Sequence, residues 1–368
     1  MDFTPTEAQR DLAELTRRIA VDHPPQDAVG SGGFDRALWA SLTSAGVLDA
    51  ALPAHVGGGG FGVLEQCSVL AELGRAVAAV PYLPTIAMAA TTLAEHADGE
   101  TLERWLVPIV RGARIVAAAL PDTGAPVSFT LDASGRLSGQ ATAVEAGAFA
   151  DGFLVAASSA EGDVLALVPA DAPGVAVSAQ EMVDHADGAL VEVSGARPDT
   201  VLPPASVPWL RRRGLLGACA RQLGVLERAL ELTAAYAAER TQFGRPIGGF
   251  QAVRHRLADG YLDVDAVRLT LWQAAWLLTE HTGSASTSDP SAPAEAELEA
   301  ELEAAIATAK YWAAEAGHRV AHTAVHLHGG VGIDVEHDVH RYFVAAKRGE
   351  FAFGGATAHL NQLGDVLA

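Results

Sequence analysis

Three long helical segments in the second half of the chain constrain its fold more than any other feature of the sequence. They span, in order, roughly 210–240, 248–281 and 294–327. Leucines in the first of them, from Leu223 to Leu230, recur at helical spacing. Helices of this length bury their apolar faces most readily against one another, so the pattern predicts a four-helix bundle completed by the segment after Tyr342.

The residues before this bundle change character near Ile115. Up to that point the sequence reads as helices with short breaks, and the glycine run 57–60 is interpreted as a flexible break. Beyond it, short apolar runs rich in Val, Gly, Thr and Ser alternate with turn signals.

These patterns predict an α+β chain of three domains. They are an N-terminal helical domain (1–113), a middle β-barrel or sandwich domain (114–206) and a C-terminal helical bundle (207–368). A Ser- and Thr-rich stretch at about 282–293 is expected to be a mobile loop between two bundle helices.

The charge of the chain restricts its partners. Its 368 residues carry a formal net charge of −20, which repels nucleic acid and anionic membranes. Two cysteines, Cys67 and Cys219, lie in apolar helical stretches and are expected to be buried rather than disulfide-bonded. Because no signal peptide and no apolar run of membrane-spanning length are evident, we expect a cytoplasmic protein.

The segment Glu239–Gln251 joins two of the long helices and carries groups suited to a nucleotide. It reads Glu-Arg-Thr-Gln-Phe-Gly-Arg-Pro-Ile-Gly-Gly-Phe-Gln. An arginine here could bind a pyrophosphate bidentately, Phe243 could pack on a flat ring, and Gly244 lets the backbone turn. The alternative interpretation is an ordinary connection between helices with a solvated arginine.

A second segment, His326–Gly332, reads His-Leu-His-Gly-Gly-Val-Gly. Its glycine pair lets backbone amides approach a phosphate or a ring edge, and it also suits the end of a helix. His318, His322 and His326 recur at a spacing of four residues, which would suit a metal ion. No cysteine or clear carboxylate ligand joins them, so we expect no metal site.

In this order and spacing, these segments resemble the acyl-CoA dehydrogenase family along nearly the whole chain. The Arg-x-x-Phe-Gly sequence followed by Phe250-Gln251 is quite specific, and so is Gly-Gly-x-Gly at 329–332. The middle segment agrees, because Leu137-Ser138-Gly139 and Ala150–Val155 resemble that family's β domain.

The resemblance implies an assembly in which each FAD lies across a subunit boundary. The flavin ring lies against one subunit, and the neighbour's bundle holds the adenosine diphosphate (ADP) arm. A glutamate removes the α-proton of an acyl thioester while the flavin takes a hydride from Cβ, and an electron-transfer flavoprotein accepts the electrons. The residues assigned to the ADP side by this resemblance are Arg240, Gln242, Phe243, Gln251, His326, Gly329 and Gly330. His326 departs from the family's pattern, because it stands where a glutamine is usual, but a histidine can still donate a hydrogen bond.

The chain departs from the family where the catalytic base should stand. Relatives place the base in a Tyr-Glu-Gly-Thr sequence, and the matching stretch puts Phe353 or Gly354 at that position. Neither residue can accept a proton, and Glu350 is three or four residues away. A smaller set of relatives carries the base at the start of the first bundle helix, where this chain has Gly214-Leu215. We therefore assign no catalytic residue to this chain.

The segments that would contact the flavin ring are altered too. Leu120–Gly124 replaces the usual Thr-Glu-Pro run, and Thr142–Glu145 replaces Trp-Ile-Thr. Because the ADP-side segments are intact, the leading hypothesis is a subunit that lends its ADP-binding half to a partner, which supplies the ring site and the glutamate. In this the chain resembles the β-type subunit of actinobacterial α2β2 acyl-CoA dehydrogenases that desaturate steroid side-chain thioesters.

Other hypotheses remain open. The chain could form a self-sufficient homo-oligomer with a displaced base, Glu350 or Asp122. It could be a structural paralogue that binds no flavin, or a relative of the monooxygenating members that lack a glutamate base. Arg211–Arg213 could form an interface, a CoA-phosphate patch or a solvated helix start.

Overall fold

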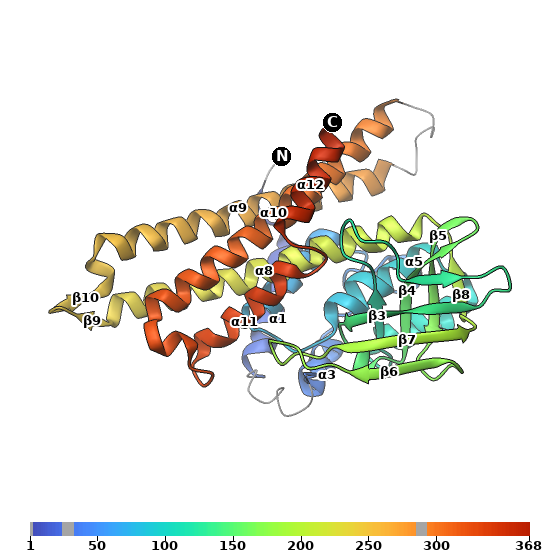
Figure 1. Cartoon of the computed structure of the whole chain (residues 1–368), viewed down its shortest axis with the longest axis horizontal. Helices are drawn as coiled ribbons and strands as arrows, with labels where there is room; N and C mark the ends of the chain where they lie inside the picture. Colours follow the sequence, from blue (N-terminus) through green and yellow to red (C-terminus); the bar gives the residue numbers. More distant parts are fainter. Residues whose placement is uncertain (1–2, 24–32, 285–292) are drawn as a thin grey trace. The chain divides into compact units, whose positions relative to one another are not determined.

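The computed structural model describes residues 3–23, 33–284 and 293–368, which form two compact units (Figure 1). The bundle unit comprises the described residues up to Ala13, Cys67–Val77 and Ala218–Ala368. The sheet unit comprises Glu14–Gln66 and Ala78–Gly217. Three of the four boundaries between the units fall within helices α1 (Glu7–Val21), α4 (Val63–Arg75) and α8 (Ser206–Glu239), and the fourth, after Val77, follows the end of α4.

The sheet unit contains a curled sheet. Its strands are β1 (Val116–Ala119), β2 (Phe129–Leu131), β3 (Leu137–Val144), β4 (Gly152–Ser159), β5 (Gly162–Pro169), β6 (Val175–Ala179), β7 (Ala189–Ala196) and β8 (Thr200–Leu202). Within residues 33–284 they are ordered β6-β7-β3-β2-β4-β5-β8, and β1 pairs in parallel with β4. In β7, Val191 and Val193 are buried while Glu192 is exposed, so this strand turns one face to the core and one to solvent.

The sheet unit also contains helical segments from the N-terminal part of the chain. They are α3 (Arg36–Ser44), η1 (Ala54–Val56), η2 (Tyr82–Ala90), α5 (Thr91–His96), α6 (Gly99–Thr101), η3 (Leu102–Leu106) and α7 (Val107–Val110). Among them, η2 and η3 contact the sheet. The π-helical η2 is entirely buried, and its Thr85 hydroxyl donates to the Val116 carbonyl oxygen of β1 at 3.1 Å. The Trp105 ring of η3 lies where a Cβ on Gly152 would stand, so the absent side chain brings η3 against β4.

The glycine run 57–60 is a tight turn and not the flexible break that its composition suggested. The Gly58 amide donates to the Pro53 carbonyl oxygen at 3.1 Å, and the Gly59 amide donates to the Asp49 carbonyl oxygen at 3.0 Å. A Cβ on Gly58 would lie 2.3 Å from the Leu52 carbonyl oxygen. The glycines are needed because the backbone folds directly onto the preceding residues.

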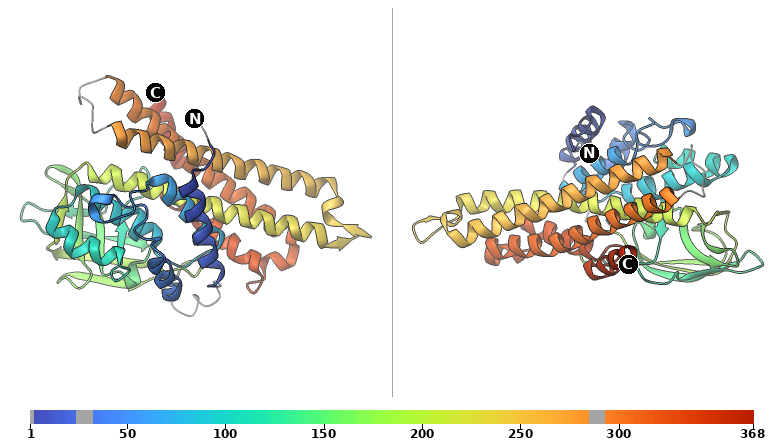
Figure 2. Two further views of the ribbon diagram at one scale, coloured as in Figure 1. Left: turned by 180° about the vertical axis from the view of Figure 1, so that it is seen from behind. Right: turned by 90° about the horizontal axis from the view of Figure 1, so that it is seen from above.

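Long helices dominate the bundle unit. They are α8, α9 (Gln251–Ser284), α10 (Pro293–His328), α11 (Asp338–Phe351) and α12 (Ala356–Leu367). Helices α9 and α10 run side by side in both views of Figure 2. The loop expected at about 282–293 is shorter at its start, because α9 continues to Ser284, and residues 285–292 lie outside the described part of the chain.

Helix α4 approaches α8 closely within the bundle unit. A Cβ on Gly224 would lie 1.8 Å from the Ala71 carbonyl oxygen, so only glycine permits this distance between the helices. At the end of α4, the Arg75 guanidinium pairs with two carboxylates of α8, Glu227 at 3.0 Å and Glu231 at 2.8 Å.

The predicted fold class is confirmed: a helical N-terminal part, a curled β-sheet and a C-terminal helical bundle. Cys67 and Cys219 are both buried, and burial raises the pKa of the Cys219 thiol to about 12. Among the residues described, no helix combines the length and apolarity needed to cross a membrane.

Candidate functional site

The Glu239–Gln251 segment forms a two-stranded hairpin at one end of the bundle unit. Strands β9 (Thr241–Gln242) and β10 (Arg245–Pro246) pair antiparallel, and Phe243 and Gly244 form the turn with φ of 51° and 77°. Positive φ at both turn residues is the geometry of a type I′ hairpin. The Phe243 side chain is 92% exposed, so a large apolar ring occupies a strained backbone position and faces solvent.

The other sequence-predicted residues lie at the end of α10 and at the start of α9. Gln251 is the first residue of α9, and the His326 side chain is exposed on the last turn of α10. Gly329 and Gly330 begin the 3₁₀ turn η6 (Gly329–Ile333). A Cβ on either glycine would meet nothing within 4 Å, so the backbone here is open to a ligand.

An aromatic stack joins these two segments within the bundle unit. The Tyr236 ring, near the end of α8, lies 4.3 Å from the His328 ring, and its hydroxyl donates to the His328 carbonyl oxygen at 3.5 Å. The His337 ring also contacts His328, edge-on, with the ring centroids 5.4 Å apart. Burial lowers the pKa of His328, which favours the neutral ring in this stack. The stack therefore brings the hairpin and the glycine pair to the same end of the bundle.

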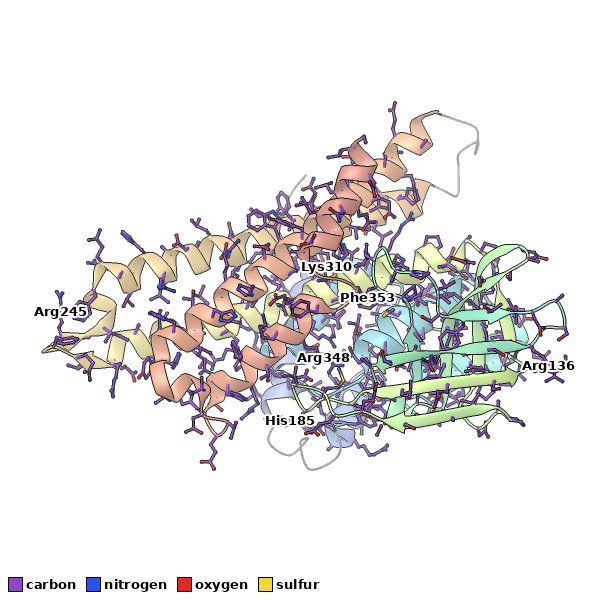
Figure 3. The ribbon with its side chains drawn as sticks, viewed as in Figure 1. Arg136, His185, Arg245, Lys310, Arg348 and Phe353 are labelled. Atoms are coloured by element: carbon purple, nitrogen blue, oxygen red, sulfur yellow. The ribbon has the colours of Figure 1, made fainter. Side chains whose placement is uncertain are left out.

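The stretch that the resemblance matches to the family's base, Phe353 and Gly354, lies in a tightly held turn after α11. Phe353 and Gly354 have φ of 58° and 100°, so consecutive residues occupy the left-handed region. The Lys310 ammonium, which is fully buried, donates to the carbonyl oxygens of Gly349, Glu350 and Gly354 at 3.4, 3.3 and 3.1 Å. Figure 3 shows Lys310 on α10 beside the turn that carries Phe353. A cation at the carboxyl end of α11 also complements the helix dipole.

His359 of α12 holds the same turn from the other side. Its Nε2 lies 3.1 Å from the Phe353 carbonyl oxygen, and since a carbonyl only accepts, Nε2 carries the hydrogen. Burial, together with the positive charge of Lys310, lowers the pKa of His359 to about 4. The turn therefore has a fixed conformation, and the residue at position 353 costs about 1–3 kcal/mol of backbone strain.

The titration of His359 predicts a pH-dependent stability. In the unfolded chain a histidine titrates near the usual 6.5, so between that value and about 4 the unfolded state binds more protons. Stability is therefore complete above about pH 6.5 and falls by about 3 kcal/mol as the pH drops towards 4. His359→Gln, which keeps an N–H donor, should flatten this dependence.

Urea unfolding at about pH 7 and about pH 4.5 tests this expectation. The control is His255→Gln, because His255 is exposed on α9 and its replacement should leave the pH dependence of the wild type. An equally steep pH dependence in His359→Gln would show that another group carries the effect.

Glu350, the displaced base of the alternative hypothesis, has its carboxylate engaged by an ion pair with a lysine and by a histidine ring. One oxygen pairs with the Lys347 ammonium and the other lies 3.4 Å from His318 Nδ1. The carboxylate is 13% exposed and sits on α11, before the strained turn. Both carboxylate oxygens are occupied by neighbouring side chains, and the residue lies before the turn matched to the base, so this geometry weighs against Glu350 as a base.

The segments expected to have lost flavin-ring contacts are irregular in the sheet unit. Strand β3 shifts register between Ala141 and Val144, and Ala143 has φ of 54°. The Ala143 amide donates to the Gln180 side chain at 2.7 Å, so this bulge is stabilised within the sheet unit. Asp122, the other candidate base, is exposed.

Arg211 and Arg213 donate hydrogen bonds to residues of other segments within the sheet unit. Arg211 donates to the Pro121 carbonyl oxygen at 3.3 Å, and Arg213 donates to the Gln66 side chain at 3.0 Å. The Arg213 guanidinium also lies 5.0 Å from the Trp209 ring centroid. Gly214 and Leu215, at the second base position of the family, are buried.

The chain's two lysines mark the turn after α11, and the sequence motifs did not single them out. Lys310 and Lys347 are the only lysines in a sequence that otherwise uses arginine, and both contact the carboxyl end of α11. Lys310 also stands alone as a charge in the apolar stretch from Ala304 to Ala314. In the parts of the chain that the structure places, no group of three or more His, Cys, Asp or Glu side chains is arranged to hold a metal ion.

Comparisons with known proteins agree with this architecture. Residues 6–113 match the family model described as "Acyl-CoA dehydrogenase, N-terminal domain", and residues 213–368 match "Acyl-CoA dehydrogenase, C-terminal domain". The chain is 46% identical over 379 residues to the acyl-CoA dehydrogenase FadE27 of Mycobacterium tuberculosis. The match covers 100% of this chain and 99% of that protein.

Solved structures give the same result. A chain in the crystal structure of the ChsE4-ChsE5 complex from Mycobacterium tuberculosis is similar with a TM-score of 0.90 and 45% identity, covering 100% of this chain and 99% of that one. A chain in the structure of a Tcur3481-Tcur3483 steroid ACAD variant is similar to this chain, with a TM-score of 0.86 and 37% identity. The match covers 98% of this chain and 98% of that chain. The chain therefore belongs to the acyl-CoA dehydrogenase family.

Proposed function

We propose that this chain is a subunit of a heteromeric, FAD-dependent acyl-CoA dehydrogenase. In the complex it contributes the ADP-side half of an intersubunit FAD site, while a homologous α-type partner supplies the catalytic glutamate. The single observation that carries this proposal is the turn at the base position. It is built and held by Lys310 and His359, yet it presents Phe353 and Gly354, which cannot accept a proton.

The residues on the bundle end fit the ADP arm. The hairpin exposes Arg240, Gln242 and Phe243, and the open backbone at Gly329 and Gly330 allows a close approach. An arginine suits a pyrophosphate, and an exposed aromatic ring suits a flat base or a partner's apolar surface. When bound, FAD would supply the hydride acceptor for the α,β-desaturation of an acyl-CoA thioester.

Two similar structures support a heteromer. One is the ChsE4-ChsE5 complex and the other is a steroid ACAD named for two chains, Tcur3481 and Tcur3483. By this likeness we propose an α2β2 assembly, a steroid side chain as the acyl group, an electron-transfer flavoprotein as electron acceptor and a cytoplasmic location. The contacts of Glu350 weigh against the self-sufficient homo-oligomer.

Arg240→Ala in the complex tests the assigned half-site. Loss of a charge-assisted contact to the pyrophosphate should weaken FAD retention by about tenfold, measured as flavin absorbance after gel filtration. Arg256→Ala is a matched control, because Arg256 is another exposed arginine at the start of α9 outside the predicted set. Unchanged flavin content in Arg240→Ala would contradict the proposed role.

A further inference from the structure

Arg245, which the sequence motifs did not single out, is held in a fixed position on the hairpin. Its guanidinium carbon lies 4.2 Å from the centroid of the Phe250 ring. A Cβ on Gly249 would lie 3.6 Å from Arg245 Cδ, so the arginine stem lies along a backbone without a side chain. The Phe243 ring meets Phe250 edge-on at 6.1 Å. This stacking orders the guanidinium before any ligand binds, which lowers the entropy cost of binding.

The hairpin places Arg245 on the same face as two residues of the proposed ADP site. Arg245 pairs directly with Gln242, and opposite residues of an antiparallel pair project from one face. Side chains two residues apart on a strand share a face, so Arg240 projects with Gln242. The Ile247 amide donates to the Arg240 carbonyl oxygen at 2.8 Å, which extends the ladder to that residue.

Two arginines give this face its positive charge. The Arg240 and Arg245 side chains are exposed, and among the described residues neither has a carboxylate within salt-bridge distance. Elsewhere in this chain, whose net charge is −20, the exposed Arg319 pairs with Asp263 at 2.6 Å. Figure 3 shows Arg245 at the tip of the hairpin, away from the bundle helices.

We propose that Arg245 is a second anion-binding residue of this site, and that Arg240 and Arg245 each bind one phosphate of a nucleoside diphosphate. The two guanidinium groups and the Gln242 amide offer several hydrogen-bond donors on one face of the hairpin. This number of donors suits a ligand with two adjacent phosphates better than a ligand with a single carboxylate. The inference rests on the proposed function, because the diphosphate is that of the ADP arm of FAD.

The test measures binding of ADP, AMP and inorganic pyrophosphate to the flavin-stripped complex by isothermal titration calorimetry. Arg245→Ala should weaken ADP and pyrophosphate binding by about tenfold and AMP binding by much less, because AMP offers one phosphate. Arg245→Lys should recover only part of the loss, since an ammonium neither stacks on Phe250 nor binds in a bidentate manner. Arg256→Ala serves as the control and should bind all three like the wild type.

The outcomes separate this inference from the proposed function. Weaker ADP binding in Arg240→Ala with wild-type binding in Arg245→Ala would overturn the role of Arg245 alone. Wild-type ADP affinity in Arg245→Ala together with weaker subunit association, measured by analytical ultracentrifugation, would also overturn it and assign Arg245 to a carboxylate of the partner. No ADP binding by the wild-type complex would contradict both proposals.

Discussion

A complex whose partner subunit carries glutamine in place of its catalytic glutamate is expected to lose about a thousandfold in acyl-CoA-dependent dye reduction. Glu350→Gln in this chain should leave the rate unchanged. The reason is that Glu350 is held by Lys347 and His318 on α11, whereas the turn at the base position presents Phe353. Steady-state dye reduction by the purified complexes gives both rates.

The control for this comparison is Glu315→Gln. Glu315 is also an ion-paired carboxylate, bonded to Arg319 at 3.1 Å on α10, so its loss reports any general effect of breaking a surface pair. A large fall in rate for Glu350→Gln, with Glu315→Gln unaffected, would favour the displaced-base hypothesis over a division of labour between subunits.

Lys310→Met is expected to lower the free energy of unfolding by about 3 kcal/mol or more. The ammonium is fully buried and satisfies the carbonyl oxygens of Gly349, Glu350 and Gly354, so its removal leaves buried acceptors without this donor. It also releases the turn that holds Phe353 at φ of 58°. Urea unfolding followed by circular dichroism measures the change.

Lys347→Met is the matched control, because Lys347 is the chain's other lysine and lies at the same end of α11. Its partner is Glu350, in an ion pair whose lysine and glutamate side chains are 23% and 13% exposed, and Glu350 keeps its contact with His318 when Lys347 is replaced. The removal should therefore cost about 1 kcal/mol, well below the cost of Lys310→Met. Equal destabilisation of the two variants would mean that the turn does not depend on the buried ammonium.

The sequence predicted the features that rest on local pattern. The segment expected at 210–240 is α8, Ser206–Glu239, and the short apolar runs expected beyond Ile115 include β4, Gly152–Ser159. Both depend on side-chain periodicity, which neighbouring residues determine.

The sequence did not predict the features that rest on long-range contacts. Lys310 meets carbonyls 39 to 44 residues further along the chain, and no local pattern indicates that a lone lysine in an apolar helix caps another helix. The same holds for Arg245, whose role depends on a ring and a glycine that only the folded hairpin brings beside it. The tight Gly58 turn was missed because composition alone does not reveal backbone packing.

The central claim is that this chain completes an FAD site whose chemistry belongs to a partner. The most direct measurement records flavin absorbance and acyl-CoA-dependent dye reduction for the chain expressed alone and co-expressed with its homologous partner. We expect colourless, inactive protein alone and a yellow, active complex together. A yellow, active protein from this chain alone would contradict the claim.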